Sequence, residues 1–358
     1  MRSVGVEEEL LLVHPETGEP QAVSGAILAA ADRDGAFEAE LHREQLEFAT
    51  EPHTAMAELA GEIRRWRRAA AERAGEVGAR VAALATSPLA VDPTIGTGER
   101  YRWLAKEFGL TTQEQLTCGC HIHVEVGSDE EGVAVIDRIR PWLPPLLALS
   151  ANSPFWQGRD SGYSSYRSRV WSRWPSAGPV EVFGSAERYH RQVRAMLATG
   201  ALLDKGMIYF DARLSHHYPT VEVRVADVCL EADDTVLVAA LVRGLVETAA
   251  RGARAGEPPQ EIGVGELRLA AWRAGRSGLT GDLVHPRTWR PAPAETVLEA
   301  LLDHTADALA ETGDLALVRD RLGEVLSRGN GARRQRETFA RTGDPRAVVA
   351  DAVARTAV

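Results

Sequence analysis

Side chains that can bind metal ions or transfer protons recur at every second position in four short stretches of this chain of 358 residues. They are Glu7 and Glu9 in residues 5–13, Gln45, Glu47 and Glu51 in 45–51, His121, His123 and Glu125 in 117–126, and Glu222 and Arg224 in 220–226. Most positions between them are apolar. Because side chains alternate between the two faces of a β-strand, each stretch is predicted to be a half-buried strand with one polar face.

If the four strands share one sheet, the polar face carries at least four carboxylates and two imidazoles. Like charges at this density repel one another unless cations bind between them. Carboxylate oxygens with few imidazoles favour hard cations such as Mg²⁺ or Mn²⁺. Because Mg²⁺ usually keeps several waters and completes its shell with substrate phosphates, the face predicts a site for a nucleoside triphosphate.

Arg224 stands two residues from Glu222 on the same predicted face, where it could stabilise charge on a transferred phosphoryl group. The chain has neither a Gly-x-x-x-x-Gly-Lys-Ser/Thr phosphate loop nor a Gly-x-Gly-x-x-Gly fingerprint, so a nucleotide would be held mainly through metal and sheet. Taken singly, residues 7–9 could be a solvated strand start, His121 and His123 a structural pair, and Glu222 with Arg224 a surface ion pair. The pattern shared by four strands favours a site.

Two features of these strands fit the polar face less well. Glu8 falls on the apolar face and is expected at the rim of the sheet. Cys118 and Cys120 stand next to the histidines, but strand alternation puts them on the opposite face, so one ion could not readily use both pairs. Together with Cys229 they are expected to be small core residues, and an odd number of cysteines argues against a disulfide framework.

The overall composition excludes several classes of protein. With 44% hydrophobic and 26% charged residues, the chain is predicted to be globular with a sizeable core. The net charge of −10 gives no general attraction to nucleic acid or to anionic membranes. No apolar run approaches the ~20 residues needed to span a bilayer, and acids stand where a signal peptide would be apolar. We therefore expect a cytoplasmic protein, with a homodimer as the commonest form of association.

The remaining segments are predicted from periodicity and from the positions of proline and glycine. Helices are expected over residues 24–34, 54–86, 98–108, 130–149 and 185–199, a strand pair over 207–213 and 219–226, and mostly helix after 233, with interruptions at 254–259 and 277–293. Residues 150–182 are rich in arginine and aromatic side chains and form a long loop, which is typical of a functional segment. Strands and helices do not alternate regularly, so the predicted fold class is α+β with an antiparallel sheet.

Seven segments together resemble the type 2 glutamate–cysteine ligases, also called carboxylate–amine ligases. They are GVEEEL at 5–10, QLEF at 45–48, GCHIHV at 119–124, SPFWQGRDSGY at 153–163, WSRWP at 171–175, TVEVR at 220–224 and GNGARRQR at 329–336. The resemblance covers nearly the whole chain. It implies a single catalytic ligase domain over residues 1–358 with a helical C-terminal portion from about 233 to 358, and a glutamine-synthetase-like fold in which helices back a curved antiparallel sheet.

The resemblance also implies a reaction and a set of site residues. The reaction is ATP-dependent amide formation through an acyl phosphate, with ATP and Mg²⁺ (or Mn²⁺) as cofactors and glutamate plus cysteine as the leading pair of small-molecule substrates. Metal ligands are expected at Glu7, Glu9, Glu47, His121 and Glu222, with Glu40 and His123 as weaker candidates; Arg224 is expected to face the transferred phosphate and, with Glu47, to be essential for catalysis. Arg159 and Tyr163 match positions that hold the substrate carboxylate. Arg167 either binds substrate or stabilises its loop, and Arg333 and Arg336 either contact nucleotide phosphates or form an exposed basic helix start.

Two other functions remain compatible with the residues. A metal-dependent amidohydrolase could use His121 and His123, although such chemistry usually needs further histidine or aspartate ligands and no nucleotide. A non-catalytic nucleotide-binding protein of the ligase fold would bind ATP without releasing ADP. Neither alternative expects a nucleic acid or a membrane as partner.

Overall fold

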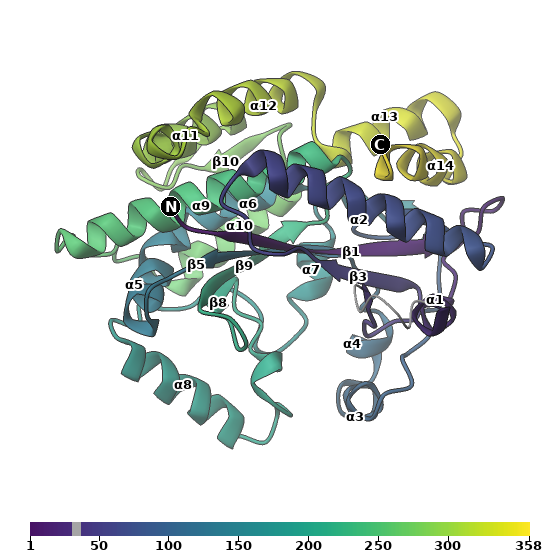
Figure 1. Ribbon diagram of the computed structural model, residues 1–358, viewed down its shortest axis with the longest axis horizontal. Coiled ribbons are helices and arrows are strands. Elements are labelled where there is room, and N and C mark those ends of the chain that lie inside the picture. The colour runs from purple at the N-terminus through teal and green to yellow at the C-terminus, as the bar shows by residue number, and fades with distance from the viewer. Residues whose placement is uncertain (31–36) are drawn as a thin grey trace.

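Within residues 1–30 and 37–358, which the computed structural model describes, seven strands form one sheet in the order β2-β3-β1-β5-β9-β8, with β4 also paired to β1. All of these strand pairs are antiparallel. The long helices α2 and α9 lie on one side of the sheet, whereas α3, α4 and α8 lie on the other side (Figure 1). The predicted class, α+β with an antiparallel sheet backed by helices, is confirmed.

The four strands predicted from alternation are all present, with small differences at their ends. The sheet consists of β1 Val4–Val13, β2 Phe37–Glu38, β3 Gln45–Ala49, β4 Arg80–Ala82, β5 Gly119–Glu125, β8 Ala212–Leu214 and β9 Thr220–Asp227. Two small hairpins join β6 Phe155–Trp156 to β7 Arg159–Asp160, and β10 Asp282–Val284 to β11 Pro291–Pro293. The strand predicted over 207–213 is shorter than expected: β8 begins only at Ala212, after the 3₁₀ turn η2 Lys205–Met207 and the irregular segment 208–211.

Helices account for most of the remaining chain. They are α1 Ser24–Ala30, α2 Met56–Glu76, α3 Glu99–Phe108, α4 Leu110–Gln113, α5 Asp129–Ile139, α6 Leu143–Ser150, α7 Arg167–Trp171, α8 Ala186–Ala198, α9 Ala232–Arg254, α10 Val264–Ser277, α11 Ala294–Thr312, α12 Leu315–Arg328, α13 Gly331–Thr342 and α14 Pro345–Thr356. The 3₁₀ turn η1 Arg140–Trp142 separates α5 from α6 at the prolines. In the described part of the chain, no helix is both long and apolar enough to cross a membrane.

One predicted helix ends earlier than the sequence suggests, and another runs to the edge of the described residues. The helix predicted over 54–86 stops at Glu76, because Gly78 adopts a left-handed conformation with φ of 74° and turns the chain back. The following segment forms β4, where Val81 pairs with Leu12 of β1. The helix predicted over 24–34 is seen as α1 up to Ala30, and its last part lies outside the described residues.

The apolar face of the sheet packs against α2, α5 and α9 in one large core that includes Val6, Ile122 and Val223. Glu8 lies on this face and is fully buried, so its expected position at the rim is wrong. Arg67 of α2 donates hydrogen bonds to its two oxygens at 2.8 and 2.7 Å. Because a buried charge is stable only when it is paired, this contact fixes the orientation of β1 and leaves the flanking glutamates on the opposite face.

Candidate active site

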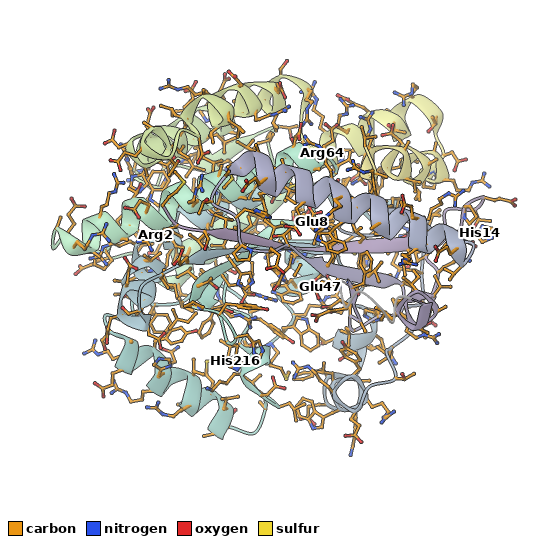
Figure 2. All side chains as sticks on the ribbon, viewed as in Figure 1. Arg2, Glu8, His14, Glu47, Arg64 and His216 are labelled. Carbon is orange, nitrogen blue, oxygen red and sulfur yellow. The ribbon has the colours of Figure 1, made fainter. Side chains whose placement is uncertain are left out.

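The side chains predicted to share a polar face do so because the sheet register places them opposite one another. Glu9 is the cross-strand partner of Glu47, and Glu7 is the partner of His121. His123 stands opposite Glu222 on β9 in the same way. Figure 2 shows Glu8 on the side of α2 and Glu47 on the other side of the sheet. The period-two pattern therefore marks one continuous polar face.

This face forms one wall of a cavity of about 280 Å³. The acidic part of the lining comes from Glu7, Glu9, Glu38, Glu40 and Glu47, joined by the imidazole of His121. The basic and aromatic part comes from Arg100, Arg213, Arg224, Tyr101, Trp171, Trp174 and Tyr209. Acidic and basic groups thus line the same cavity, which suits a ligand that carries both metal-bound and free anionic groups.

Three overlapping groups of ligand atoms lie on this face. They are Glu9 with Glu40 and Glu47, Glu7 with Glu47 and His121, and Glu7 with His123 and Glu222. Within each group the ligand atoms lie within 4.8 Å of one another. Because Glu47 and Glu7 each belong to two groups, the candidate metal positions form a row across β3, β1, β5 and β9.

Burial and crowding of like charges shift the pKa of several groups on this face. Burial and the charge of Glu40 raise the pKa of Glu9 to about 7, and burial with the neighbouring glutamates raises the pKa of Glu47 well above its usual value. Burial, together with the charge of Arg224, lowers the pKa of His121 to about 4. The Nε2 atom of His121 is buried and makes no hydrogen bond to any described residue. A neutral imidazole with a free nitrogen beside crowded carboxylates fits a hard divalent cation.

The row ends at an ion-pair network around Glu222. Arg213 donates to both Glu222 oxygens, at 2.7 and 3.1 Å, and Arg224 forms an ion pair with the same carboxylate. Burial alone would raise the pKa of Glu222, but the charges of Arg224 and Arg213 lower it instead. The Arg224 guanidinium also lies 5.6 Å from the ring of Trp171 and 5.9 Å from that of Tyr209. Arg224 is therefore held on several sides.

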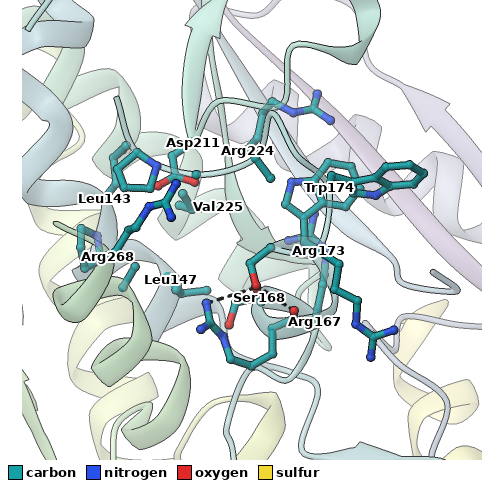
Figure 3. A pocket seen from close by; sticks show the side chains of 18 of the residues that line it. Leu143, Leu147, Arg167, Ser168, Arg173, Trp174, Asp211, Arg224, Val225 and Arg268 are labelled. Carbon is teal, nitrogen blue, oxygen red and sulfur yellow. Dashed lines mark hydrogen bonds between the residues drawn. The ribbon is translucent and has the colours of Figure 1, made fainter. Parts of the chain in front are cut away.

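A second cavity of about 400 Å³ meets the first at Arg224, Trp171 and Trp174 (Figure 3). Arg167 lines this second cavity, 5.6 Å from the Trp171 ring. A Cβ atom at Gly119 of β5 would come within 2.2 Å of Arg167 Nη2, so this strand needs a glycine where the arginine crosses it. Arg167 is thus positioned between sheet and loop, in the lining of the cavity that Arg224 also reaches.

Proteins of known family share the sequence of this chain over nearly its whole length. A family model described as glutamate–cysteine ligase family 2 (GCS2) matches residues 3–352. The chain belongs to this family. A Streptomyces avermitilis protein, provisionally named glutamate–cysteine ligase 2-1, is 64% identical over 360 residues, which cover 99% of each chain. The protein is therefore a ligase of the glutamate–cysteine ligase type, as the sequence resemblance implies.

Solved structures share the fold at low sequence identity. The glutamate–cysteine ligase of Francisella tularensis, solved in complex with AMP, has a TM-score of 0.69 at 14% identity, and the match covers 99% of this chain and 88% of that one. A bifunctional glutathione synthetase from Pasteurella multocida has a TM-score of 0.69 at 15% identity, with 99% and 52% covered. The predicted glutamine-synthetase-like fold class is thereby confirmed.

Six of the predicted site residues do not line either cavity: Glu222 and His123, which belong to one group of ligand atoms on the sheet, and four residues outside the main sheet. Arg159 is exposed on β7, and the Tyr163 hydroxyl accepts a hydrogen bond from Trp272 at 3.2 Å. The other two are arginines of α13: Arg333 pairs with Glu337 at 2.9 Å, and Arg336 binds both oxygens of Asp160. Their roles toward substrate and nucleotide stay predictions of the family resemblance.

The structure also adds residues that the sequence pattern did not single out. Arg213 lies on the three-residue strand β8. The sequence signal that could have found it is its spacing of two residues from Asp211, which is the spacing of side chains on one face of a strand. Arg100 reaches the first cavity from α3, and Arg268 reaches the second from α10. No local motif marks these two, because only the packing of distant helices brings them to the sheet.

Proposed function

We propose that this ligase joins the carboxylate of an amino acid to an amine in a reaction that consumes ATP and requires Mg²⁺ or Mn²⁺. The observation that carries the proposal is the row of three overlapping ligand groups that ends beside Arg224. Glu7, Glu9, Glu40, Glu47, His121, His123 and Glu222 would hold the cations. When bound, the cations would offset the charge of the ATP phosphates.

The reaction in this proposal has two steps. A carboxylate oxygen of the acid attacks the γ-phosphorus of ATP, and ADP leaves. The amine nitrogen then attacks the carbonyl carbon of the acyl phosphate, inorganic phosphate leaves, and the nitrogen loses a proton. Arg224 stabilises the charge on the migrating phosphoryl group, because ion pairing and the rings of Trp171 and Tyr209 already fix its guanidinium.

A covalent enzyme intermediate is not part of the proposal. Cys118 and Cys120 are buried on the core side of the sheet, and burial raises the pKa of both thiols well above the usual value. A protonated, buried thiol is a poor nucleophile. The cysteines are therefore core residues, as the sequence predicts.

Glutamate with cysteine is the first substrate pair to test. The name of the Streptomyces avermitilis relative and the solved Francisella tularensis ligase support this choice. The two cavities supply separate places for the reactants: the acidic one for ATP with its cations, and the arginine-lined one for the acid. They share Arg224, where the γ-phosphate and the acid carboxylate must meet.

The amidohydrolase alternative gains no support from the geometry. His121 and His123 belong to different ligand groups, and carboxylates outnumber imidazoles in every group. An imidazole-rich site for hydrolysis would need the two histidines on one ion.

The deciding experiment measures ADP release from ATP and Mg²⁺ with glutamate and cysteine, and then with other acid and amine pairs, with mass spectrometry of the product. The proposal expects ADP and an amide in equal amounts, and no turnover in EDTA. Amide cleavage without ATP would favour a hydrolase. ATP binding without ADP release for any pair would favour a non-catalytic role.

A further inference from the structure

Asp211 is the one carboxylate in the lining of the second cavity, as far as the described residues define it. It lies in the bend before β8, next to Arg224 on the neighbouring strand. Arg224 N–H donates to its carbonyl oxygen at 2.9 Å, and its own N–H donates to Gly178 at 3.0 Å. These two bonds fix the backbone of Asp211 beside the residue at which the two cavities meet.

The Asp211 carboxylate accepts no hydrogen bond from any residue in the described ranges, although it faces two cations. Figure 3 shows Asp211 and Arg268 pointing toward each other across the cavity. Arg268 is exposed and forms no hydrogen bond or ion pair within residues 1–30 and 37–358, whereas Arg169 has a buried Nε without a partner. Burial raises the pKa of Asp211 to about 7 despite the charges of Arg268 and Arg169.

A half-buried carboxylate and two guanidinium groups that share a wall, with no hydrogen bond between them, offer a ligand one anionic and two cationic groups and favour partners of opposite charge. A free α-amino acid supplies both partners. Its carboxylate can bind a guanidinium, and its ammonium can bind the carboxylate of Asp211. Leu143, Leu147 and Val225 line the same cavity and can pack against an aliphatic stem.

The position of Arg224 orients such a ligand. An amino acid whose α-ammonium binds Asp211 has its side chain free to extend toward Arg224, the wall shared with the acidic cavity. A side-chain carboxylate would then reach the γ-phosphate, while the α-carboxylate stays on the arginines. Asp211 gives an ammonium group a partner that a polyphosphate has no use for, which favours the amino acid rather than the nucleotide in this cavity.

We propose that Asp211 binds the α-ammonium of the acid substrate, so that the ligase selects free amino acids with a reactive side-chain carboxylate. The inference rests on the proposed ligase function and names the residue that distinguishes glutamate from glutarate, the same dicarboxylate without the amino group. Asp211 acts as a specificity-determining residue that touches the substrate.

The test compares kcat/KM for glutamate and for glutarate in the wild type, in Asp211→Asn and in Asp211→Glu. Loss of a hydrogen bond to a charged group should lower kcat/KM for glutamate by about 10- to 150-fold in Asp211→Asn, with glutarate nearly unaffected and the KM for ATP unchanged. Asp211→Glu keeps the charge and should recover part of the preference. Asp307→Asn, an exposed change on α11, serves as the matched control.

Three outcomes would overturn the inference. Equal losses for glutamate and glutarate would show a merely structural role. A raised KM for ATP with an unchanged glutamate-to-glutarate ratio would place the nucleotide in this cavity. If the wild type releases no ADP with any pair, the proposed function fails; calorimetric binding of glutamate and glutarate to wild type and Asp211→Asn then decides the inference separately, and equal affinities would refute it.

Discussion

Glu8 and Glu9 are adjacent in β1, yet their carboxylates have opposite surroundings. Glu8 lies under α2, where Arg67 binds both of its oxygens and Thr235 donates a further hydrogen bond at 2.5 Å. Glu9 lies in the cavity, where the Gly119 N–H donates at 2.7 Å and the carboxylate of Glu40 crowds it. A buried charge that protein groups satisfy makes each partner necessary to the fold, whereas one that they leave crowded is free to bind a ligand.

Glu8→Gln should give the largest effect and should act on stability alone. It leaves Arg67 buried without its counter-charge, and breaking one partner of a buried pair costs about 3–5 kcal/mol. Denaturant unfolding measures the free energy of unfolding, and the KM for ATP of the folded protein should stay unchanged. A loss below about 1 kcal/mol, the size of an average substitution, would contradict a structural role for this pair.

Glu47→Gln should give the converse result. It removes a ligand shared by two of the three groups, so ADP release should fall by at least about 100-fold, as when a key electrostatic group is lost from an active site. In EDTA the free energy of unfolding should stay within about 0.5 kcal/mol of wild type or rise, because a crowded buried charge has been removed. Glu51→Gln, just beyond β3 and exposed, is the control and should keep full activity. A fully active Glu47→Gln would refute the site.

Mg²⁺ should stabilise the folded protein through the carboxylates around Glu9 and not through Glu8. The effect should be smaller than that of the two substitutions above. A cation at about 100 times its dissociation constant stabilises the folded state by about 2.7 kcal/mol, which corresponds to a rise of several degrees in the thermal midpoint. Differential scanning fluorimetry in Mg²⁺ and in EDTA measures the rise. It should persist in Glu51→Gln and nearly vanish in Glu47→Gln. An equal rise in both variants would mean that the cation binds elsewhere.

Much of the acidic face was predictable from the sequence because strand alternation is a local rule. Once residues 5–13, 45–51, 117–126 and 220–226 are strands, the faces of Glu7, Glu9, Glu47 and His121 follow, and one assumption, a shared sheet, brings them together. The same rule placed Glu8 on the apolar face. It could not find Arg67, because that partner lies 59 residues away on a helix.

The rest of the site depends on long-range packing that no local pattern encodes. Asp211 lies in a bend, and Arg268 reaches it from α10. The alanine-rich segment after α2 has helical propensity, but pairing with β1 makes it strand β4. The motifs around Arg159 and Arg336 resemble the family and yet lie outside both cavities, so sequence similarity located them without defining what they touch.

Arg224→Lys should have the smallest of these effects. It distinguishes two roles for Arg224 in the cavity, stabilising the migrating phosphoryl group and anchoring ATP. Lysine keeps the positive charge beside Glu222 but loses the planar fork and the stacking over Trp171. ADP release should therefore slow by about 10-fold or more, while the affinity for ATP changes little, because the cations would still hold its phosphates. The control is Arg321→Lys on α12, since Arg321 is also an arginine in ion pairs, with Asp233 and Glu324. It shows what the change from arginine to lysine does away from the cavity. If nucleotide affinity and rate fall in parallel, Arg224 anchors ATP in the ground state, and stabilisation of the migrating phosphoryl group must come from another residue of the cavity.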